Sequence, residues 1–293
     1  MALELTPQTA TWMPFTNREP STRRRPRVLD AAAVGVVALL LLVVVIGPWI
    51  APYEPDATNI GEALRAPSMS HWLGTDDLGR DVLSRVLVGT RSSLLTSMVI
   101  VTSFALLGIL VATIATVGGR WVDEILMRLC DIGLALPGMV VALGFAAAMG
   151  PSLRSATIAL IIGAVPVSAR VLRGVMRKTM EEPFIEGARA LGVPRRRLLL
   201  SHVLPNSLDV MLVQWTVDIG HTVVVLSALS FIGVGALPPS AEWGASIAAS
   251  QGYIADGWWV AASFGAAITI TAVAFGLVGD MLQGRRDPSL RGR

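Results

Sequence analysis

Asp218 and His221 are two ionisable residues in a stretch of the sequence that is otherwise rich in apolar side chains. Their spacing places both on one face of a helix, with Gln214 one turn before Asp218. An enzyme would need a third group beside them, a nucleophile or a metal ligand, and the sequence supplies none. Two roles stay open for Gln214, Asp218 and His221. They either form hydrogen bonds that hold two helices together, or line a path through the protein.

A second cluster carries residue types that can bind a metal ion, namely His71, Asp76, Asp77 and Asp81. Arg80 and Arg85 lie next to these acids, so we expect ion pairs rather than a metal site. A helix is expected to start here, with a cap from one of three residues, Thr75, Asp76 or Asp77. Its apolar stripe would lie against a membrane surface, and consists of Val82, Val86 and Leu87.

The sequence lacks the common motifs of nucleotide and hydrolase chemistry. It contains no P-loop, no G-x-S-x-G, no H-E-x-x-H and no dinucleotide-binding fingerprint. We therefore expect no catalytic residue, no bound cofactor and no metal in this chain, which cannot hydrolyse ATP by itself.

The elements that hold these residues are predicted to be membrane-spanning helices. The chain is 53% apolar and 15% charged, with a mean hydropathy of +0.62, whereas soluble proteins carry about 25% charged residues. Long uncharged runs of about 20 residues suit a bilayer. They predict an all-α, polytopic membrane protein with one domain at residues 30–283. The six expected spans cover residues 31–50, 92–117, 125–149, 155–178, 206–232 and 258–282. Cys130, inside a predicted span, is the single cysteine of the sequence, so no disulfide can form within the chain.

The placement of positive charge predicts how the spans are oriented. Most of the 24 Lys and Arg residues fall in segments that share one side of the membrane, which is the positive-inside pattern. This puts the tails at residues 1–29 and 284–293 and the loop at residues 179–205 in the cytoplasm. Residues 51–91 are expected outside. Because no basic face exists away from the membrane ends, nucleic-acid binding is not expected.

Residues 181–205 are the longest polar and basic interruption between the later spans, and they read as two short helices joined by a tight turn. Pro183 fits the first turn of a helix, and Gly192 can end that helix in a left-handed conformation. Pro194 then starts the second helix. Four residues of the first helix fall on one face at helical spacing, namely Phe184, Ile185, Ala188 and Leu191.

The sequence E-G-A-R-A-L-G within this segment resembles the EAA loop of permease subunits in ABC-type importers. In that family the loop is a coupling helix that docks into a groove on a cytoplasmic ATPase. The resemblance implies that residues 181–200 couple to the ATPase, through Phe184, Glu186, Gly187, Ala188, Leu191 and Gly192. Gly187 departs from the usual central Ala, and a Gly inside a helix costs about 0.5–1 kcal/mol relative to Ala.

Three further stretches resemble one branch of the same family. H71-W-L-G-T-D-D-L-G-R-D-V-L-S-R-V-L-V-G-T-R91 is similar to the second permease subunit of dipeptide, oligopeptide and nickel importers. G-A-L-P-P-S-A-E-W-G, before the last span, and the closing G-D-M-L-Q-G-R-R-D-P-S-L-R are similar to segments of that subunit too. Together the resemblance covers most of the chain from Ala31 onward.

The resemblance implies a multi-pass subunit of the cell's inner membrane that imports peptides by alternating access. The expected partners are a second permease, two ATPase domains that bind ATP and Mg²⁺, an external substrate-binding protein and membrane lipid. Two alternatives remain: an ATPase-independent secondary transporter or channel, or the same permease role with nickel or another small solute as cargo.

Overall fold

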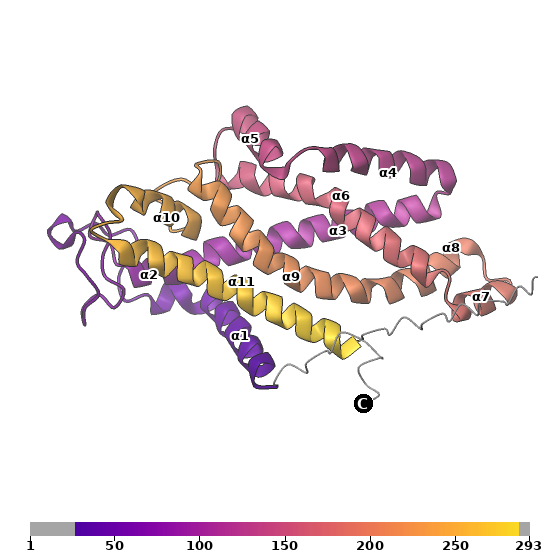
Figure 1. Ribbon diagram of the computed structural model, residues 1–293, viewed down its shortest axis with the longest axis horizontal. Helices are drawn as coiled ribbons and strands as arrows, with labels where there is room; N and C mark the ends of the chain where they lie inside the picture. Colours follow the sequence, from indigo (N-terminus) through magenta and orange to yellow (C-terminus); the bar gives the residue numbers. More distant parts are fainter. Residues whose placement is uncertain (1–26, 287–293) are drawn as a thin grey trace, which may run out of the picture.

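The computed structural model describes residues 27–286, which form a bundle of helices (Figure 1). Within this range, five helical stretches are long and apolar enough to cross a membrane. A sixth crossing would combine two helices that meet at an 85° bend. The expected all-α, polytopic fold is confirmed. The outer parts of both expected tails, residues 1–26 and 287–293, lie outside the described residues.

The long helices follow the predicted order of spans. The first, α1, begins at Arg27, ahead of the expected start at residue 31. The second stretch runs without a break from Val82 to Val117, as α2, one π-helical turn and α3. The long helices are α1 (Arg27–Ile50), α3 (Thr96–Val117), α4 (Arg120–Ala135), α6 (Leu153–Thr179), α9 (Leu204–Phe231) and α11 (Trp258–Arg286). The shorter ones are α2 (Val82–Thr90), α5 (Gly138–Met149), α7 (Pro183–Ala190), α8 (Arg195–Leu198) and α10 (Trp243–Ser250).

The predicted third span is two helices, α4 and α5, rather than one. Leu136 is extended, with φ −92° and ψ 126°, and Pro137 takes the position before α5. A proline disfavours helical backbone at the residue before it and cannot donate the hydrogen bond that would continue the helix. The axis therefore turns by 85° at this point, and α5 leans away from α4 (Figure 1).

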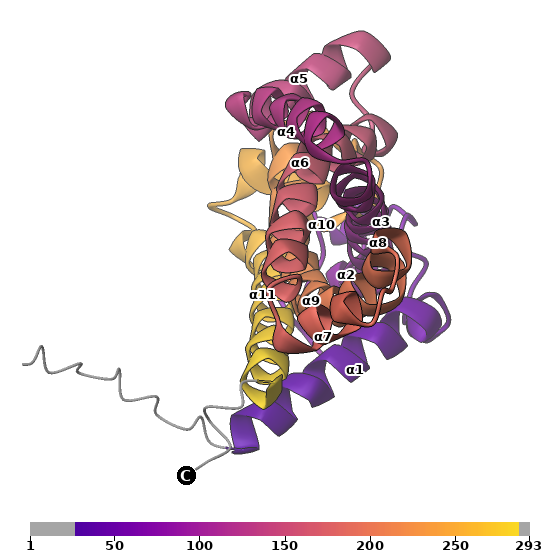
Figure 2. The ribbon, with the colours of Figure 1, turned by 90° about the vertical axis from the view of Figure 1, so that its right-hand side faces the viewer.

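The core lies where α3, α6, α9 and α11 pack against one another. Ile219, Leu226 and Phe264 are among its fully buried side chains. Gly108 of α3 lets that helix approach α6 closely, because a Cβ there would meet the Ser168 hydroxyl oxygen at 2.4 Å. Seen along the bundle, α1 and the α4–α5 pair lie at opposite edges (Figure 2). Most of the apolar surface of α1 is exposed, as lipid contact requires.

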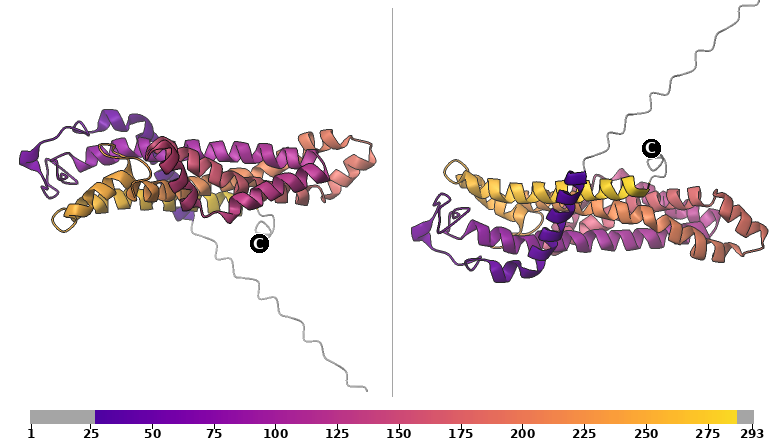
Figure 3. Two further views of the ribbon diagram at one scale, coloured as in Figure 1. Left: turned by 90° about the horizontal axis from the view of Figure 1, so that it is seen from above. Right: turned by 90° about the horizontal axis from the view of Figure 1, so that it is seen from below.

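The short elements gather at the two ends of the bundle. Helices α7 and α8 lie at one end, while α10 and residues 51–81 lie at the other (Figures 1 and 3). A second apolar cluster sits at the α7–α8 end, separate from the main core. The fold therefore places the predicted coupling segment and the predicted external segment at opposite ends of the spanning helices.

Candidate functional site

Helix α7 forms as the local sequence predicts. Pro183 occupies its first turn, where a missing N–H costs nothing. The chain leaves α7 through Gly192, which has φ +79°, and the N–H of Val193 donates to the Ala188 carbonyl at 3.2 Å. Pro194 then precedes α8. The first short helix and the left-handed glycine after it are confirmed. The second is not a separate short helix, because α8 continues through the π-helical turn Leu199–Val203 into α9, with Pro205 inside the continuous stretch Arg195–Phe231.

The apolar face expected on α7 is divided between the protein and its surroundings. Ile185 is fully buried and Ala188 is half-buried. Phe184 and Leu191 are 51% and 86% exposed, so the rest of the chain covers this apolar face only in part. The helix touches the bundle along one narrow line, which leaves its flanks uncovered.

The exposed side of α7 also carries a charged residue and a glycine with free space around it. Glu186 is exposed, and nothing lies within 4 Å of a Cβ added at Gly187. Phe184, Glu186 and Leu191 thus present apolar and charged side chains on the surface at this end of the molecule. Such a surface, with apolar anchors beside a charge, suits contact with another protein.

The buried side of α7 belongs to the second apolar cluster, which joins α3, α6, α8 and α9. Its members are Ala112, Leu172, Met176, Ile185, Leu198, Leu199, Val203 and Met211. Close packing of this kind transmits displacement instead of absorbing it. A shift of α7 must therefore move the ends of α6 and α9.

Ion pairs bind the same end of the bundle together. Asp123 of α4 accepts hydrogen bonds from Arg173 and Arg177 of α6, the latter at 2.6 Å. Arg195 of α8 donates to the carbonyl of Thr116 at 3.4 Å. These bonds tie the start of α4 to α6, and α8 to the end of α3.

Asp131, inside the predicted third span, pairs with Arg170 of α6. Arg128 is the nearest basic residue to Asp131 along α4, but it pairs with Glu124, one turn earlier on that helix, at 3.0 Å. The partner differs because α4 packs along α6, which brings Arg170 within reach. Asp131 therefore serves helix packing.

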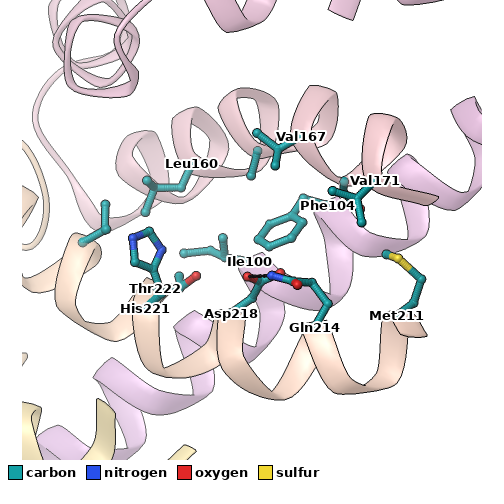
Figure 4. Close-up of a pocket in the computed structure, with 13 residues that line it drawn as sticks. Ile100, Phe104, Leu160, Val167, Val171, Met211, Gln214, Asp218, His221 and Thr222 are labelled. Carbon is teal, nitrogen blue, oxygen red and sulfur yellow. Dashed lines mark hydrogen bonds between the residues drawn. The ribbon is translucent and has the colours of Figure 1, made fainter. Parts of the chain in front are cut away.

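A groove of about 220 Å³ opens between α3, α6 and α9 (Figure 4). Its walls are mostly apolar. They consist of Ile100, Phe104, Leu160, Ala164, Val167, Ser168, Val171, Met211, Gln214, Asp218, His221, Thr222 and Val225. The three polar residues singled out in the sequence all come from α9, and Figure 4 shows them in a row along one side of that helix, facing α6.

Within this row, Gln214 Nε2 donates to Asp218 Oδ1 at 2.8 Å (Figure 4). Gln214 and His221 are exposed and Asp218 is half-buried. The polar pairing is thus within α9, and the side chains face a groove instead of bridging two spans. A bond between α9 and α3 comes from a residue that the sequence did not single out, since Trp215 Nε1 donates to Thr102 Oγ1 at 3.1 Å.

At the opposite end, residues 51–81 are held by buried polar groups. His71 Nδ1 lies 2.9 Å from Asp81 Oδ1, and its Nε2 lies 3.2 Å from Glu62 Oε2. Burial lowers the pKa of His71, but the hydrogen bonds to Asp81 and Glu62 outweigh it, so the pKa is raised above its ordinary value. The imidazolium form of His71 is therefore stabilised in the folded protein.

The helix after this segment begins later than predicted. Asp81 is its cap, because the carboxylate accepts from the Ser84 N–H at 2.8 Å. Asp76 instead closes its own loop by accepting from the N–H groups of Leu78 and Arg80. Val82 is fully buried in the main core, so the predicted membrane-surface helix is wrong and α2 is the start of a span.

The expected ion pairs around Arg80 and Arg85 are present. Arg80 Nε bonds to Asp76 Oδ2 at 2.7 Å, and Arg85 bonds to Asp56 at 2.7 Å. Arg85 is only 3% exposed, and it also donates to the carbonyls of Pro239 and Ser240 at 3.2 and 3.1 Å. It therefore fastens residues 51–81 to the loop before α10.

Glu242 is another buried charged residue at this end, and the sequence did not single it out. It is fully buried, accepts from the Ala245 N–H at 2.9 Å and so caps α10. Its other oxygen accepts from the hydroxyl of Ser93 at 3.2 Å. A Glu directly before a short apolar stretch was the only sequence signal for this role.

Comparisons with known proteins agree with this arrangement. Residues 104–292 match the family described as binding-protein-dependent transport system inner membrane component, and residues 31–67 match the N-terminal TM domain of oligopeptide transport permease C. A probable D,D-dipeptide transport system permease protein of Escherichia coli K12 is 39% identical over 90% of this chain and 89% of its own length. A dipeptide transport system permease protein of Alkalihalophilus pseudofirmus is 34% identical over 94% and 90%.

A structural relative shares the fold at low sequence identity. It is a chain of the MetNI methionine ABC transporter in inward-facing conformations, with a TM-score of 0.51 and 16% identity. The match covers 66% of this chain and 94% of the other.

Proposed function

Because the chain belongs to the family of binding-protein-dependent transport system inner membrane components, we propose that the importer in which it serves as a permease carries short peptides. The chain is a multi-pass inner-membrane subunit of an ATP-driven importer, and its family consists of transport permeases, not of enzymes. The observation that carries the cargo proposal is the name of its relatives, which transport dipeptides and are aligned over nine-tenths of the chain.

The partners proposed for this subunit follow from its surfaces. A second permease would close the groove between α3, α6 and α9, which is open on one side. Two ATPase domains would bind α7 through Phe184, Glu186 and Leu191, with Gly187, Ala188 and Gly192 shaping the helix and its end. ATP and Mg²⁺ would be held by those domains, and this chain would bind neither.

The orientation proposed here places α7 and α8 in the cytoplasm, together with both termini. The support is the excess of arginine at that end, where Arg173, Arg177 and Arg195 lie. Residues 51–81 and α10 would then face the external substrate-binding protein. The buried bonds of Arg85 and Glu242 would keep that docking end rigid.

The mechanism proposed is alternating access driven through α7. Closure of the ATPases on ATP would displace α7, and the cluster around Ile185 would pass that displacement to α6 and α9. These two helices form walls of the groove, so its opening would switch from one side of the membrane to the other. Transport then depends on differential stability of two conformations, with no chemistry on the cargo.

The test is uptake of a labelled dipeptide by liposomes that contain the complete transporter with its binding protein. ATP-dependent accumulation is the expected result. Accumulation without ATPase subunits would instead indicate a secondary transporter or channel. Uptake of a nickel chelate with no uptake of peptide would overturn the peptide cargo while leaving the permease role intact.

A further inference from the structure

The groove between α3, α6 and α9 has a charge pattern that distinguishes one end of a peptide from the other. Asp218 is the single carboxylate among the described residues that line it, and none of those residues is Lys or Arg. His221 is the other titratable group of the lining. Arg170, which precedes the lining residue Val171 on α6, is paired with Asp131 of α4. The groove therefore presents negative charge and no fixed positive charge.

Asp218 has a free hydrogen-bonding position towards this space. Gln214 donates to Oδ1, while Oδ2 accepts no hydrogen bond from the described residues. On α6, the hydroxyl of Ser168 lines the same groove, is buried and has no hydrogen-bond partner there either. Asp218 lines the groove and is only half-buried, so its open oxygen is available to a polar ligand, whereas the Ser168 hydroxyl is covered by the close approach of Gly108 on α3.

We propose that Asp218 receives the α-ammonium group of a peptide in transit, which makes it a specificity-determining residue of the pathway. This inference rests on the peptide cargo proposed above. A free peptide amino end is protonated near neutral pH, and an ammonium paired with a carboxylate forms a charge-assisted hydrogen bond. The apolar wall formed by Phe104, Val167 and Val171 then lies beside the side chains of the peptide.

The size and openness of the groove also indicate how strongly this subsite binds a peptide. At about 220 Å³ the groove is smaller than the roughly 300–1,000 Å³ of common ligand pockets, and it is open on one side. A transit site must bind its cargo well enough to admit it and weakly enough to release it. We expect weak binding whose selectivity comes from the single ammonium contact.

The experiment is saturation-transfer NMR on the purified complex of permeases and ATPases, without the binding protein. The probes are dialanine and its N-acetyl derivative, which lacks the ammonium group. For the wild type we expect dialanine to bind about tenfold more tightly than the acetylated peptide, the ratio expected for one charge-assisted hydrogen bond. In Asp218→Asn the two affinities should become equal, and Asp218→Glu should restore most of the difference.

Asp209→Asn is the matched control, because it removes the same charge from α9 outside the groove lining. It should keep the tenfold preference. Equal affinities in the wild type, no detectable binding of either peptide, or a preference that persists in Asp218→Asn would each overturn the subsite. Dipeptide uptake by the complete transporter would still support the peptide cargo in those cases, so the two proposals fail separately.

Discussion

Ile185 of α7 and Met211 of α9 are buried in one apolar cluster, and Met211 also forms part of the groove wall. The proposed ATPase-binding helix and the proposed cargo path are thus joined by packed side chains. Force applied to α7 has a continuous route to the groove through this cluster, because a packed interior resists compression.

Ile185→Ala should weaken this route. Removing a fully buried isoleucine side chain costs about 2–5 kcal/mol, so α7 should loosen from α6 and α9. We expect ATP hydrolysis to continue while dipeptide uptake falls sharply. Phe184→Ala is the control, since Phe184 is half exposed and its loss should weaken ATPase binding without destabilising the subunit. Thermal unfolding, ATPase activity and uptake separate the two effects, and normal uptake in Ile185→Ala would contradict the route.

Glu186→Lys and Gly192→Val should both reach the membrane and both impair coupling. Glu186 is exposed, so its replacement changes stability by no more than about 0.5 kcal/mol. Gly192 has φ +79°, where a β-branched residue is strained by about 1–3 kcal/mol at the end of α7. The readouts are expression, copurification of the ATPase and uptake. If both variants import peptide normally, α7 is not the coupling element.

Arg85→Ala should destabilise the end of the bundle that carries residues 51–81. The side chain is nearly buried and its loss leaves Asp56 and the carbonyls of Pro239 and Ser240 without their donor. Asp56 is 58% exposed and is hydrated when Arg85 is removed, so the cost is that of the lost hydrogen bonds to the carbonyls, about 1–3 kcal/mol. Arg65→Ala removes an exposed pair with Glu62 and should cost less than about 1 kcal/mol. Unfolding of the two variants in detergent, followed by tryptophan fluorescence, measures the difference, and similar unfolding temperatures would refute this role.

The stability of residues 51–81 should depend on pH through His71. Its pKa is raised above 6.5 in the folded state, so the unfolded state releases its proton first as pH rises. The contribution of the imidazolium to stability is full below about 6.5 and is lost as pH rises through the raised pKa. Protease cleavage within residues 51–81 should therefore increase over that pH range. His71→Asn should flatten the profile, and an unchanged profile in that variant would assign the effect to other groups.

Met69 and Arg196 are both exposed and lie at opposite ends of the bundle. We predict that they lie on opposite sides of the membrane. Single cysteines at these positions, in a Cys130→Ser background, can be tested with a membrane-impermeant maleimide on intact spheroplasts. Met69→Cys should react, while Arg196→Cys should react only after the membrane is opened. The reverse pattern would invert the proposed orientation.

The sequence by itself determined the features that depend on neighbours along the chain. Runs of uncharged residues marked the spans, and Pro183, Gly192 and Pro194 marked the limits of α7 and α8. These signals are local, because a proline or a left-handed glycine acts on its own backbone. The resemblance of E-G-A-R-A-L-G to a coupling loop could also be identified from the sequence alone. A docking helix must carry its contact residues on one short element.

Only the tertiary structure decided which partners the polar side chains meet. Asp131 pairs with Arg170 instead of Arg128, and Arg85 reaches the carbonyls of Pro239 and Ser240, far along the chain. Asp218 lines a groove and accepts its hydrogen bond from Gln214 of its own helix, not from a neighbouring span. Helical spacing shows which residues share a face, but the direction of that face depends on how each helix packs against elements distant in sequence. The local sequence pattern therefore does not determine how each helix is rotated about its axis within the bundle.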